Sequence, residues 1–224
     1  ATIPTRAFSE QTINFRNIII NGDMSIAQRG TSFTGITATQ YTLDRQRAGI
    51  TTAGTWTISQ STDVPSGQGF GYSLKYDCTT ADASLGASDV VFNEQRVEGQ
   101  NLQYLKKGTS NAESLTLSFW VKSNKTGTYI TQLYDTDNTR QISKSYTINS
   151  ADTWEKKTIT FAGDTTGAFV NDNLQSLRVR HWLVAGSDFT SGTLGTSWEN
   201  VVSANTAVGQ VNLADSTSNE WYIT

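Results

Sequence analysis

The sequence is poor in the residues on which disulfide, zinc and membrane proteins depend. Among 224 residues there is one cysteine, Cys78, and one histidine, His181, so an internal disulfide and the usual zinc constellations are excluded. No stretch approaches the roughly 18 apolar residues of a membrane span, and the start carries no charged-then-apolar signal region. We therefore expect no membrane partner.

Charge is also scarce, and it has the wrong sign for a nucleic-acid partner. Lys and Arg number 17 against 20 Asp and Glu, which gives a net charge of -3 and a pI near 5.2. Nucleic-acid binding usually needs a basic patch, so nucleic acid is not expected as a partner. The abundant residues are 34 Thr, 23 Ser and 15 Asn, while 6 Trp, 8 Tyr and 9 Phe supply a packed core and argue against disorder.

Apolar and polar residues alternate with a period of two, which predicts strands. The clearest case is 113–123, where four apolar residues share one face: Leu115, Leu117, Phe119 and Val121. Further strands are predicted at 41–50, 55–60, 71–78, 90–98, 128–135, 140–148, 154–161, 177–184, 208–213 and 220–224, with Gly, Asn and Asp in the turns and a Thr/Ser/Gly loop at 31–40.

This pattern predicts an all-β fold, an antiparallel β-sandwich or jelly roll. One short helix is expected near residues 99–107, because lysines occupy its last turn and Gly108 follows. Residues 1–16 are polar and irregular and are interpreted as an N-terminal arm for docking or oligomer contact. Residues 17–224 are predicted to form a single jelly-roll domain.

Catalysis is not indicated. His181 alternates with Leu177, Val179 and Leu183 on the expected core face, and Cys78 shares an apolar face with Tyr76, so both are interpreted as core residues. Most carboxylates fall in turns, where capping explains them. A polysaccharide-degrading enzyme stays open as an alternative, and its mark would be a cleft with two facing carboxylates.

No cofactor is expected, although calcium is a possible structural ligand. The turn containing Asp135, Asp137 and Asn138 offers the hard carboxylate and amide oxygens that calcium prefers. It lacks the glycine and distal glutamate of an EF-hand loop. The alternative is an ordinary turn capped by its own side chains.

Two tryptophans are candidates for binding a glycan. Trp120 alternates away from the apolar stripe of its strand, and Trp182 does the same beside Arg178 and Arg180. An exposed tryptophan on a polar sheet face suits stacking on a sugar ring. The alternative is that another sheet, a loop or a neighbouring subunit covers each face.

Several stretches resemble a class of bacteriophage proteins. The resemblance is carried by NIIINGDMSIAQRGTSF at residues 17–33 and by YTLDR at 41–45, and the middle agrees with SLTLSFWVKS at 114–123 and WEKKTITF at 154–161. The class is abundant in phages of aquatic bacteria, whose members are described as tail-fibre or virion structural proteins. The paired middle segments also look like the jelly rolls of carbohydrate-binding modules. In this class the strand that resembles 221–224 usually continues into a Gly-x-Gln-Leu-Glu segment.

The resemblance implies a non-enzymatic protein of the virion: a fibre, decoration or tail component. Its partners would be other virion proteins and further copies of itself, with a homotrimer favoured because fibres usually are trimers. Recognition of a host-surface glycan is the expected role. The alternative is a purely structural capsid or tail decoration protein without a ligand.

Overall fold

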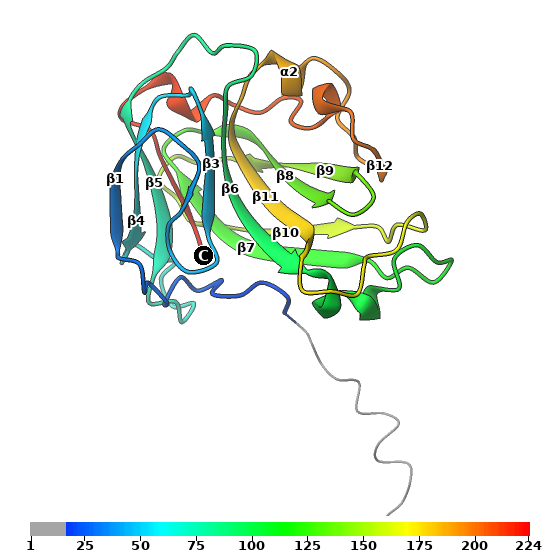
Figure 1. Ribbon diagram of the computed structural model, residues 1–224. Coiled ribbons are helices and arrows are strands. Elements are labelled where there is room, and N and C mark those ends of the chain that lie inside the picture. The colour runs from blue at the N-terminus through cyan, green and yellow to red at the C-terminus, as the bar shows by residue number, and fades with distance from the viewer. Residues whose placement is uncertain (1–16) are drawn as a thin grey trace, which may run out of the picture.

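The computed structural model describes residues 17–224, which form two antiparallel sheets packed face to face (Figure 1). Sheet A has six strands in the order β1 (Ser32–Ile36), β4 (Thr55–Ser61), β5 (Ser73–Thr80), β13 (Glu220–Ile223), β7 (Leu115–Ser123) and β10 (Glu155–Phe161). Sheet B has seven in the order β12 (Glu199–Asn200), β9 (Arg140–Ile148), β8 (Gly127–Asp135), β11 (Gln175–Ala185), β6 (Val90–Glu98), β3 (Arg47–Thr51) and β2 (Gln40–Tyr41). The predicted all-β sandwich is confirmed, and the predicted arm at 1–16 lies outside the described residues.

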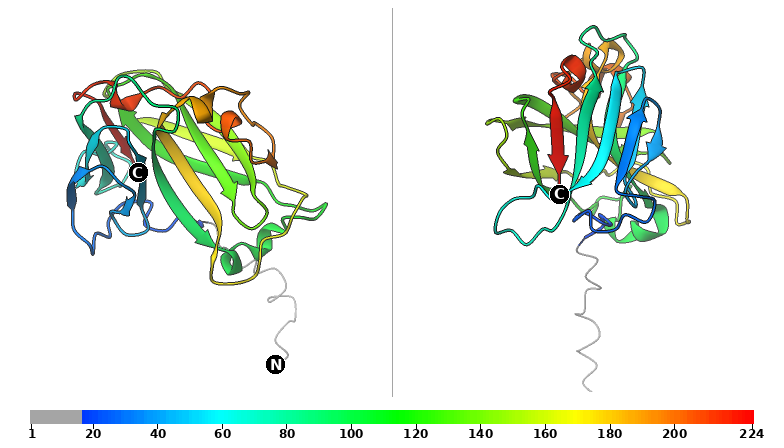
Figure 2. Two further views of the ribbon diagram at one scale, coloured as in Figure 1. Left: turned by 45° about the horizontal axis from the view of Figure 1, so that its top comes forward. Right: turned by 90° about the vertical axis from the view of Figure 1, so that its left-hand side faces the viewer.

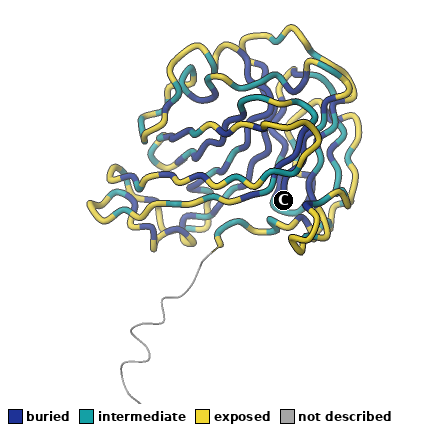
Figure 3. Tube along the Cα trace, turned by 180° about the vertical axis from the view of Figure 1, so that it is seen from behind, coloured by how far each residue is buried: buried dark blue, intermediate teal, exposed yellow. Residues whose placement is uncertain are grey.

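The alternation predicted for β7 is the one that the structure shows. Phe119 and Val121 are buried between the sheets, whereas Thr116 and Ser118 face outward. Successive side chains of a strand point to opposite faces, so one face of β7 enters the core and the other meets solvent. Figure 3 shows the same division across the molecule, with buried strands inside and exposed turns at the rims.

Several predicted boundaries were wrong for local reasons. The strand predicted at 41–50 is interrupted by a turn in which Arg45 has φ 66°, which separates β2 from β3. The helix expected near 99–107 consists of two 3-10 turns, η1 (Gly99–Asn101) and η2 (Gln103–Leu105), which end at Lys106 with φ 51°. No strand forms at 208–213, and β1 lies in the predicted loop at 31–40.

Aromatic side chains connect the two sheets through the core. Edge contacts run from Trp56 to Tyr76 to Trp221, with ring centroids 6.3 and 5.9 Å apart, and Trp221 lies 6.1 Å from His181. The His181 ring in turn lies 4.8 Å from that of Phe119. Such tilted and edge-on contacts suit aromatic rings in a close-packed interior. Cys78 is buried next to these aromatic rings, as predicted.

The segment that follows β11 folds over the outer face of sheet B. Its first part contains α2 (Ser187–Thr190) and η3 (Ser203–Asn205), and α2 lies above the end of β11 (Figures 1 and 2). The later turn η4 (Leu213–Asp215) instead packs Leu213 and Ala214 into the core between the sheets. Amide side chains fasten the first part, because Gln141 donates to the carbonyl of Val202 and accepts from the Thr206 hydroxyl, both at 3.0 Å. No helix in residues 17–224 is long and apolar enough to cross a membrane.

Candidate functional site

The strand register of sheet B gathers polar and aromatic side chains on its outer face. β11 pairs Arg178 with Arg96 and Tyr134, and it pairs Arg180 with Glu94 and Gln132. Glu94 pairs in turn with Arg47, which lies beside Tyr41. We call this surface the arginine face, and it consists of two adjacent rows: Tyr134, Arg178 and Arg96, then Gln132, Arg180, Glu94, Arg47 and Tyr41.

Glu94 is the centre of the arginine face. Its side chain is fully buried, and its carboxylate accepts from Arg47 Nη1 at 2.9 Å, Arg96 Nε at 2.6 Å and Arg180 Nε at 2.6 Å. Burial alone would raise the pKa of Glu94, but the Arg180 and Arg96 guanidinium groups outweigh it, and the pKa lies below its usual range. Glu94 is therefore charged at neutral pH and holds the arginines in place.

Arg178 is the least satisfied of these arginines. Its Nη1 lies 3.9 Å from the Glu94 carboxylate, and its side chain donates no hydrogen bond to a described residue, although Nε is buried. The guanidinium lies over the Tyr134 ring at 5.3 Å. Burial, together with repulsion from Arg180 and Arg96, lowers the pKa of Arg178. A further anion near Arg178 would relieve this repulsion.

A hollow of about 290 Å³ adjoins the arginine face. It is lined by Tyr41, Arg45, Arg96, Val97, Glu98, Asn173, Leu174 and Gln175. Tyr41 is 43% exposed and Leu174 is 66% exposed, so apolar surface lies at its edge. The Gln175 side-chain oxygen is buried and has no hydrogen-bond partner within residues 17–224. Aromatic surface next to guanidinium and amide groups is suited to a polar ring such as a sugar.

Trp182 does point to the outer face of sheet B, but it is no stacking platform. Only 2% of it is exposed, because it packs against Phe92 and Phe189 under the segment that carries α2. Its indole Nε1 donates to Gln132 at 3.2 Å. A loop covers this face, as the alternative interpretation of Trp182 expected. The prediction that Trp182 is exposed for stacking on a sugar is therefore corrected.

Trp120 lies on the outer face of sheet A, away from the arginine face. It is half-buried, and it stands opposite Lys156 in the pairing of β7 with β10. The structure therefore brings Arg178 and Arg180 together and leaves Trp120 on the other sheet. Trp120 stays a separate candidate for stacking.

The predicted calcium ligands form a turn capped by its own side chains. Asp135 accepts from the backbone amides of Asp137 and Asn138 at 2.9 and 3.1 Å and from the Asn138 side chain at 2.8 Å. The Lys107 ammonium lies 2.6 Å from the same carboxylate. Residues 17–224 contain no group of three or more His, Cys, Asp or Glu arranged for a metal ion. Asp135 thus has an ammonium as its cation, and calcium binding stays a prediction.

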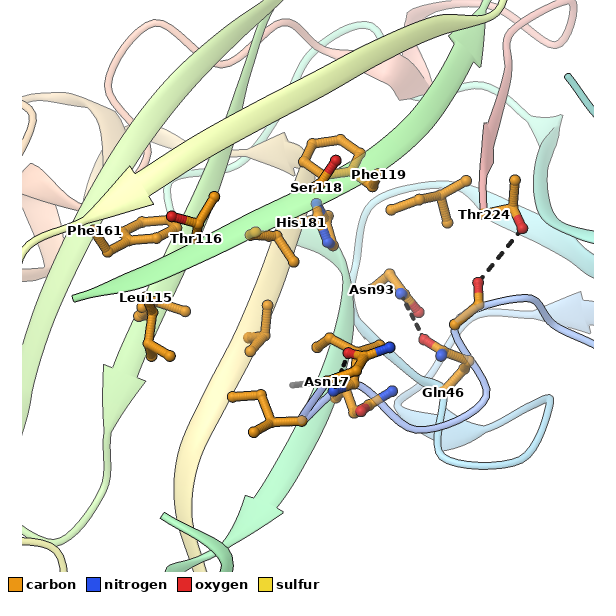
Figure 4. Close-up of a pocket in the computed structure, with 18 of the residues that line it drawn as sticks. Asn17, Gln46, Asn93, Leu115, Thr116, Ser118, Phe119, Phe161, His181 and Thr224 are labelled. Atoms are coloured by element: carbon orange, nitrogen blue, oxygen red, sulfur yellow. Dashed lines mark hydrogen bonds between the residues drawn. The ribbon is translucent and has the colours of Figure 1, made fainter. Parts of the chain in front are cut away.

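A second and larger cavity, of about 570 Å³, opens between the two sheets; we call it the cleft (Figure 4). Leu115, Leu117, Phe119 and Phe161 line it from sheet A. Sheet B contributes Leu133, Val179, His181, Asn93 and Gln95, and residues 17–24 border it. The cleft exists because β13 pairs with the 121–123 part of β7, and the backbone bonds between Thr224 and Trp120 are the next along that edge. Residues 115–119 therefore have β10 on one side and the cleft on the other.

Four polar side chains that line the cleft already have hydrogen-bond partners within the protein. Asn93 donates to Gln46 at 2.9 Å, and Gln95 bonds both the amide and the carbonyl of Ile20, at 2.7 and 2.8 Å. Thr131 and His181 share a hydrogen bond of 3.2 Å, and burial lowers the pKa of His181 to about 3. His181 is thus neutral at pH 7, as expected of a core histidine. The cleft suits an apolar group more than a sugar.

Sequence reasoning found Arg178 and Arg180 but missed the residues around them. Glu94 and Arg96 lie two residues apart in β6 and therefore share one face of it, a signal that the sequence offered and that was not used. Their meeting with β11 depends on which strands pair, and a single sequence does not give this pairing. Tyr41 and Arg47 were placed on one continuous strand, which the turn at Arg45 divides.

Comparisons with known proteins give structural likeness without a sequence relative. No family model matches the chain, and no curated protein matches it. Among solved structures, the enzymatically active domain of tailspike protein 4 of bacteriophage CBA120 aligns with 92% of this chain at 11% identity and a TM-score of 0.43. The chain covers 20% of that structure's length.

Two further solved structures align over most of their own length. A putative sugar binding protein from Bacteroides thetaiotaomicron aligns with 93% of this chain and 96% of its own length, at 12% identity and a TM-score of 0.45. A CBM4 structure aligns over 92% and 94%, at 12% identity and a TM-score of 0.41. At these scores no function is transferred, and the phage class that the sequence resembles is not confirmed.

Proposed function

We propose that this chain is a non-enzymatic binding module that holds a glycan on the arginine face. The observation that carries the proposal is the register of sheet B, which sets Tyr134, Arg178 and Arg180 beside Glu94 and next to a hollow edged by Tyr41. Guanidinium and amide groups bind sugar hydroxyls, and tyrosine faces pack on the apolar faces of sugar rings.

The absence of catalysis is part of the proposal, and the cavity linings support it. Glu113 is the one carboxylate among the described residues that line the cleft, and it pairs with Lys106 at 2.9 Å. Glu98 is the one carboxylate that lines the hollow, and it pairs with Arg45 at 2.8 Å. Among residues 17–224, neither lining contains the two facing carboxylates that glycoside hydrolysis requires.

The proposal places the module on a phage virion, as a fibre, decoration or tail component that contacts other virion proteins and assembles as a homotrimer. This part rests on the sequence resemblance at residues 17–33 and 114–123. The alternative is a structural decoration protein without a ligand. It would leave Arg178 as a partly buried guanidinium whose side chain donates no hydrogen bond within residues 17–224.

Binding of the labelled protein to an array of bacterial surface polysaccharides tests the proposal. Tyr41→Ala removes an exposed ring from the arginine face, Trp120→Ala removes the candidate ring on sheet A, and Lys156→Gln serves as a surface control on sheet A. We expect saturable binding that Tyr41→Ala weakens and the other two substitutions leave unchanged.

Loss of binding in Trp120→Ala alone would move the site to sheet A and overturn the assignment to the arginine face. A folded protein that binds no polysaccharide on the array would favour the structural alternative. Release of oligosaccharides from a bound polysaccharide would contradict the proposal that the chain is not an enzyme.

A further inference from the structure

We infer that the arginine face selects an acidic saccharide, one that bears carboxylate groups, over its neutral counterpart. The inference rests on the proposed function, because it names the class of glycan bound at the same site. It is carried by the charge balance around Glu94, by the unused hydrogen-bond donors of Arg178 and by the access of solvent to the four arginines.

The charge around Glu94 is unbalanced. Four guanidinium groups surround one carboxylate, which leaves an excess of three positive charges among these five side chains, although the whole chain has a net charge of -3. The next ion pair, Arg45 with Glu98, is balanced and does not change this excess. A concentration of one sign against the sign of the whole protein attracts a ligand of opposite charge.

The excess charge is reachable from solvent. The side chains of the four arginines are between 14% and 28% exposed, whereas Glu94 beneath them is fully buried. Glu94 occupies one guanidinium nitrogen each of Arg47, Arg96 and Arg180 at hydrogen-bond distance. Arg180 Nη1 also donates to Gln132 at 3.5 Å, and the other N–H groups of these side chains form a layer of donors over a buried anion. A carboxylate that approaches this layer finds forked donors that match its two oxygens.

Arg178 is the residue on which selectivity depends most. Its side chain donates no hydrogen bond to a described residue, and the Tyr134 ring supports its guanidinium at 5.3 Å. The same ring supports Arg180, also at 5.3 Å. Two guanidinium groups are thus held against one aromatic ring, so that a bound carboxylate would lie beside a surface on which its sugar ring can pack.

The features of this face favour a saccharide over a nucleic acid. The excess is three charges among the five side chains around Glu94, and the exposed aromatic beside them is Tyr41 at the edge of a hollow of about 290 Å³. Nucleic-acid binding commonly neutralises many phosphates along an extended basic surface. A short anionic segment with a sugar ring fits the observed area better.

The test measures affinity for matched pairs of polysaccharides that differ only in charge. Polygalacturonate, alginate and hyaluronan are each compared with a preparation whose carboxyl groups have been converted to methyl esters. Dextran sulfate beside dextran distinguishes sulfate from carboxylate, and single-stranded DNA tests a general polyanion. We expect at least one acidic member to bind about tenfold more tightly than its ester, with an affinity that falls as sodium chloride is raised.

Single substitutions in the intact chain test whether the selectivity for acidic polysaccharides depends on Arg178. Arg178→Gln removes one charge and no side-chain hydrogen bond, so the fold is expected to persist, and near-ultraviolet circular dichroism checks this. We expect about tenfold weaker binding of the acidic polymer, an unchanged affinity for any neutral one, and partial recovery in Arg178→Lys. Lys156→Gln removes one exposed charge on sheet A and is expected to change nothing.

The possible results separate this inference from the proposed function. Binding of esters as tight as binding of acids would overturn the inference and leave glycan binding standing. Binding of no polysaccharide would overturn both. Equal affinity for dextran sulfate or DNA would replace carboxylate selection by general anion binding and so overturn it as well. Acid-selective binding that Arg178→Gln does not weaken would remove the assignment to the arginine face.

Discussion

Two buried charges of opposite sign are held in different ways in this molecule. The Glu94 cluster consists of Glu94 with Arg47, Arg96, Arg178 and Arg180 on the outer face of sheet B. In the Lys107 cluster, the Lys107 ammonium contacts carboxylate oxygens of Asp135 and Asp164 at 2.6 and 3.1 Å and donates to the carbonyls of Thr166 and Gly167 at 2.9 and 2.7 Å.

The two clusters differ in balance and in access. Arg140 also pairs with Asp164, so the Lys107 cluster has two positive and two negative charges, and the Lys107 side chain is only 4% exposed. Its polar groups are bonded within the protein, as a structural tie requires. The Glu94 cluster has three positive charges in excess and reaches solvent. A closed, balanced cluster fixes loops together, whereas an open, unbalanced one is available to a ligand.

The largest expected effect tests the closed cluster. Lys107→Met leaves the carboxylates of Asp135 and Asp164 buried without their ammonium, so the free energy of unfolding should fall by about 3–5 kcal/mol. Urea unfolding measures the loss. Lys106→Met is the matched control, because Lys106 is the neighbouring residue and its pair with Glu113 is exposed, and a loss of less than about 1 kcal/mol is expected there. Equal losses would contradict the comparison.

Glu94→Gln tests the open cluster and should act in opposite directions on stability and on binding. Four arginines lose their central anion but remain partly hydrated, so a smaller loss of about 2–3 kcal/mol is expected. The positive excess rises to four, so affinity for an acidic polysaccharide should increase in the same variant. Isothermal titration and urea unfolding measure the two effects, with Glu113→Gln as an exposed control. A loss of both stability and affinity in Glu94→Gln would show that Glu94 serves the fold alone.

The pH dependence of the free energy of unfolding distinguishes His181, which lines the cleft, from the charged groups of the two clusters, because they titrate in different pH ranges. The pKa of His181 is about 3 in the folded chain and about 6.5 when unfolded, so below pH 6.5 the unfolded chain binds a proton that the folded chain does not. The free energy of unfolding should therefore fall by about 2 kcal/mol between pH 7 and pH 5.

His181→Gln removes this titration, and its stability should be nearly flat over that range. The lowered pKa values of Glu94 and Asp164 act at lower pH: their stabilisation is present above about pH 4.3 and is lost as these carboxylates are protonated. A slope between pH 7 and pH 5 that survives in His181→Gln would assign it to another group.

The smallest expected effect concerns calcium. The Lys107 ammonium already contacts Asp135, so millimolar calcium is expected to leave the melting temperature of the parent unchanged relative to a chelator. In Lys107→Met the vacated carboxylate and carbonyl oxygens are of the kind that calcium binds, and calcium should raise the melting temperature. A rise in the parent would support the calcium site predicted from Asp135, Asp137 and Asn138.

The local residue pattern was enough to predict most strands, whereas the arginine face depends on which strands pair. The strands predicted at 90–98 and 140–148 are observed with the same boundaries as β6 and β9. The same reasoning placed Trp182 on the outer face correctly but could not show the segment that covers it. Covering depends on the path of residues 186–207, which carry little periodicity of their own.

By itself, the sequence determined the class of fold, the burial of Cys78 and His181, and the common face of Arg178 and Arg180. These follow from period-two patterning and composition, which act within one strand. Only the tertiary structure decided that Glu94 lies under four arginines and that Lys107 contacts Asp135. Such charges meet across strands and loops that are distant in the sequence. Their pairing is set by the packing of the whole sandwich, because a buried charge must find its partner wherever the fold brings one within reach.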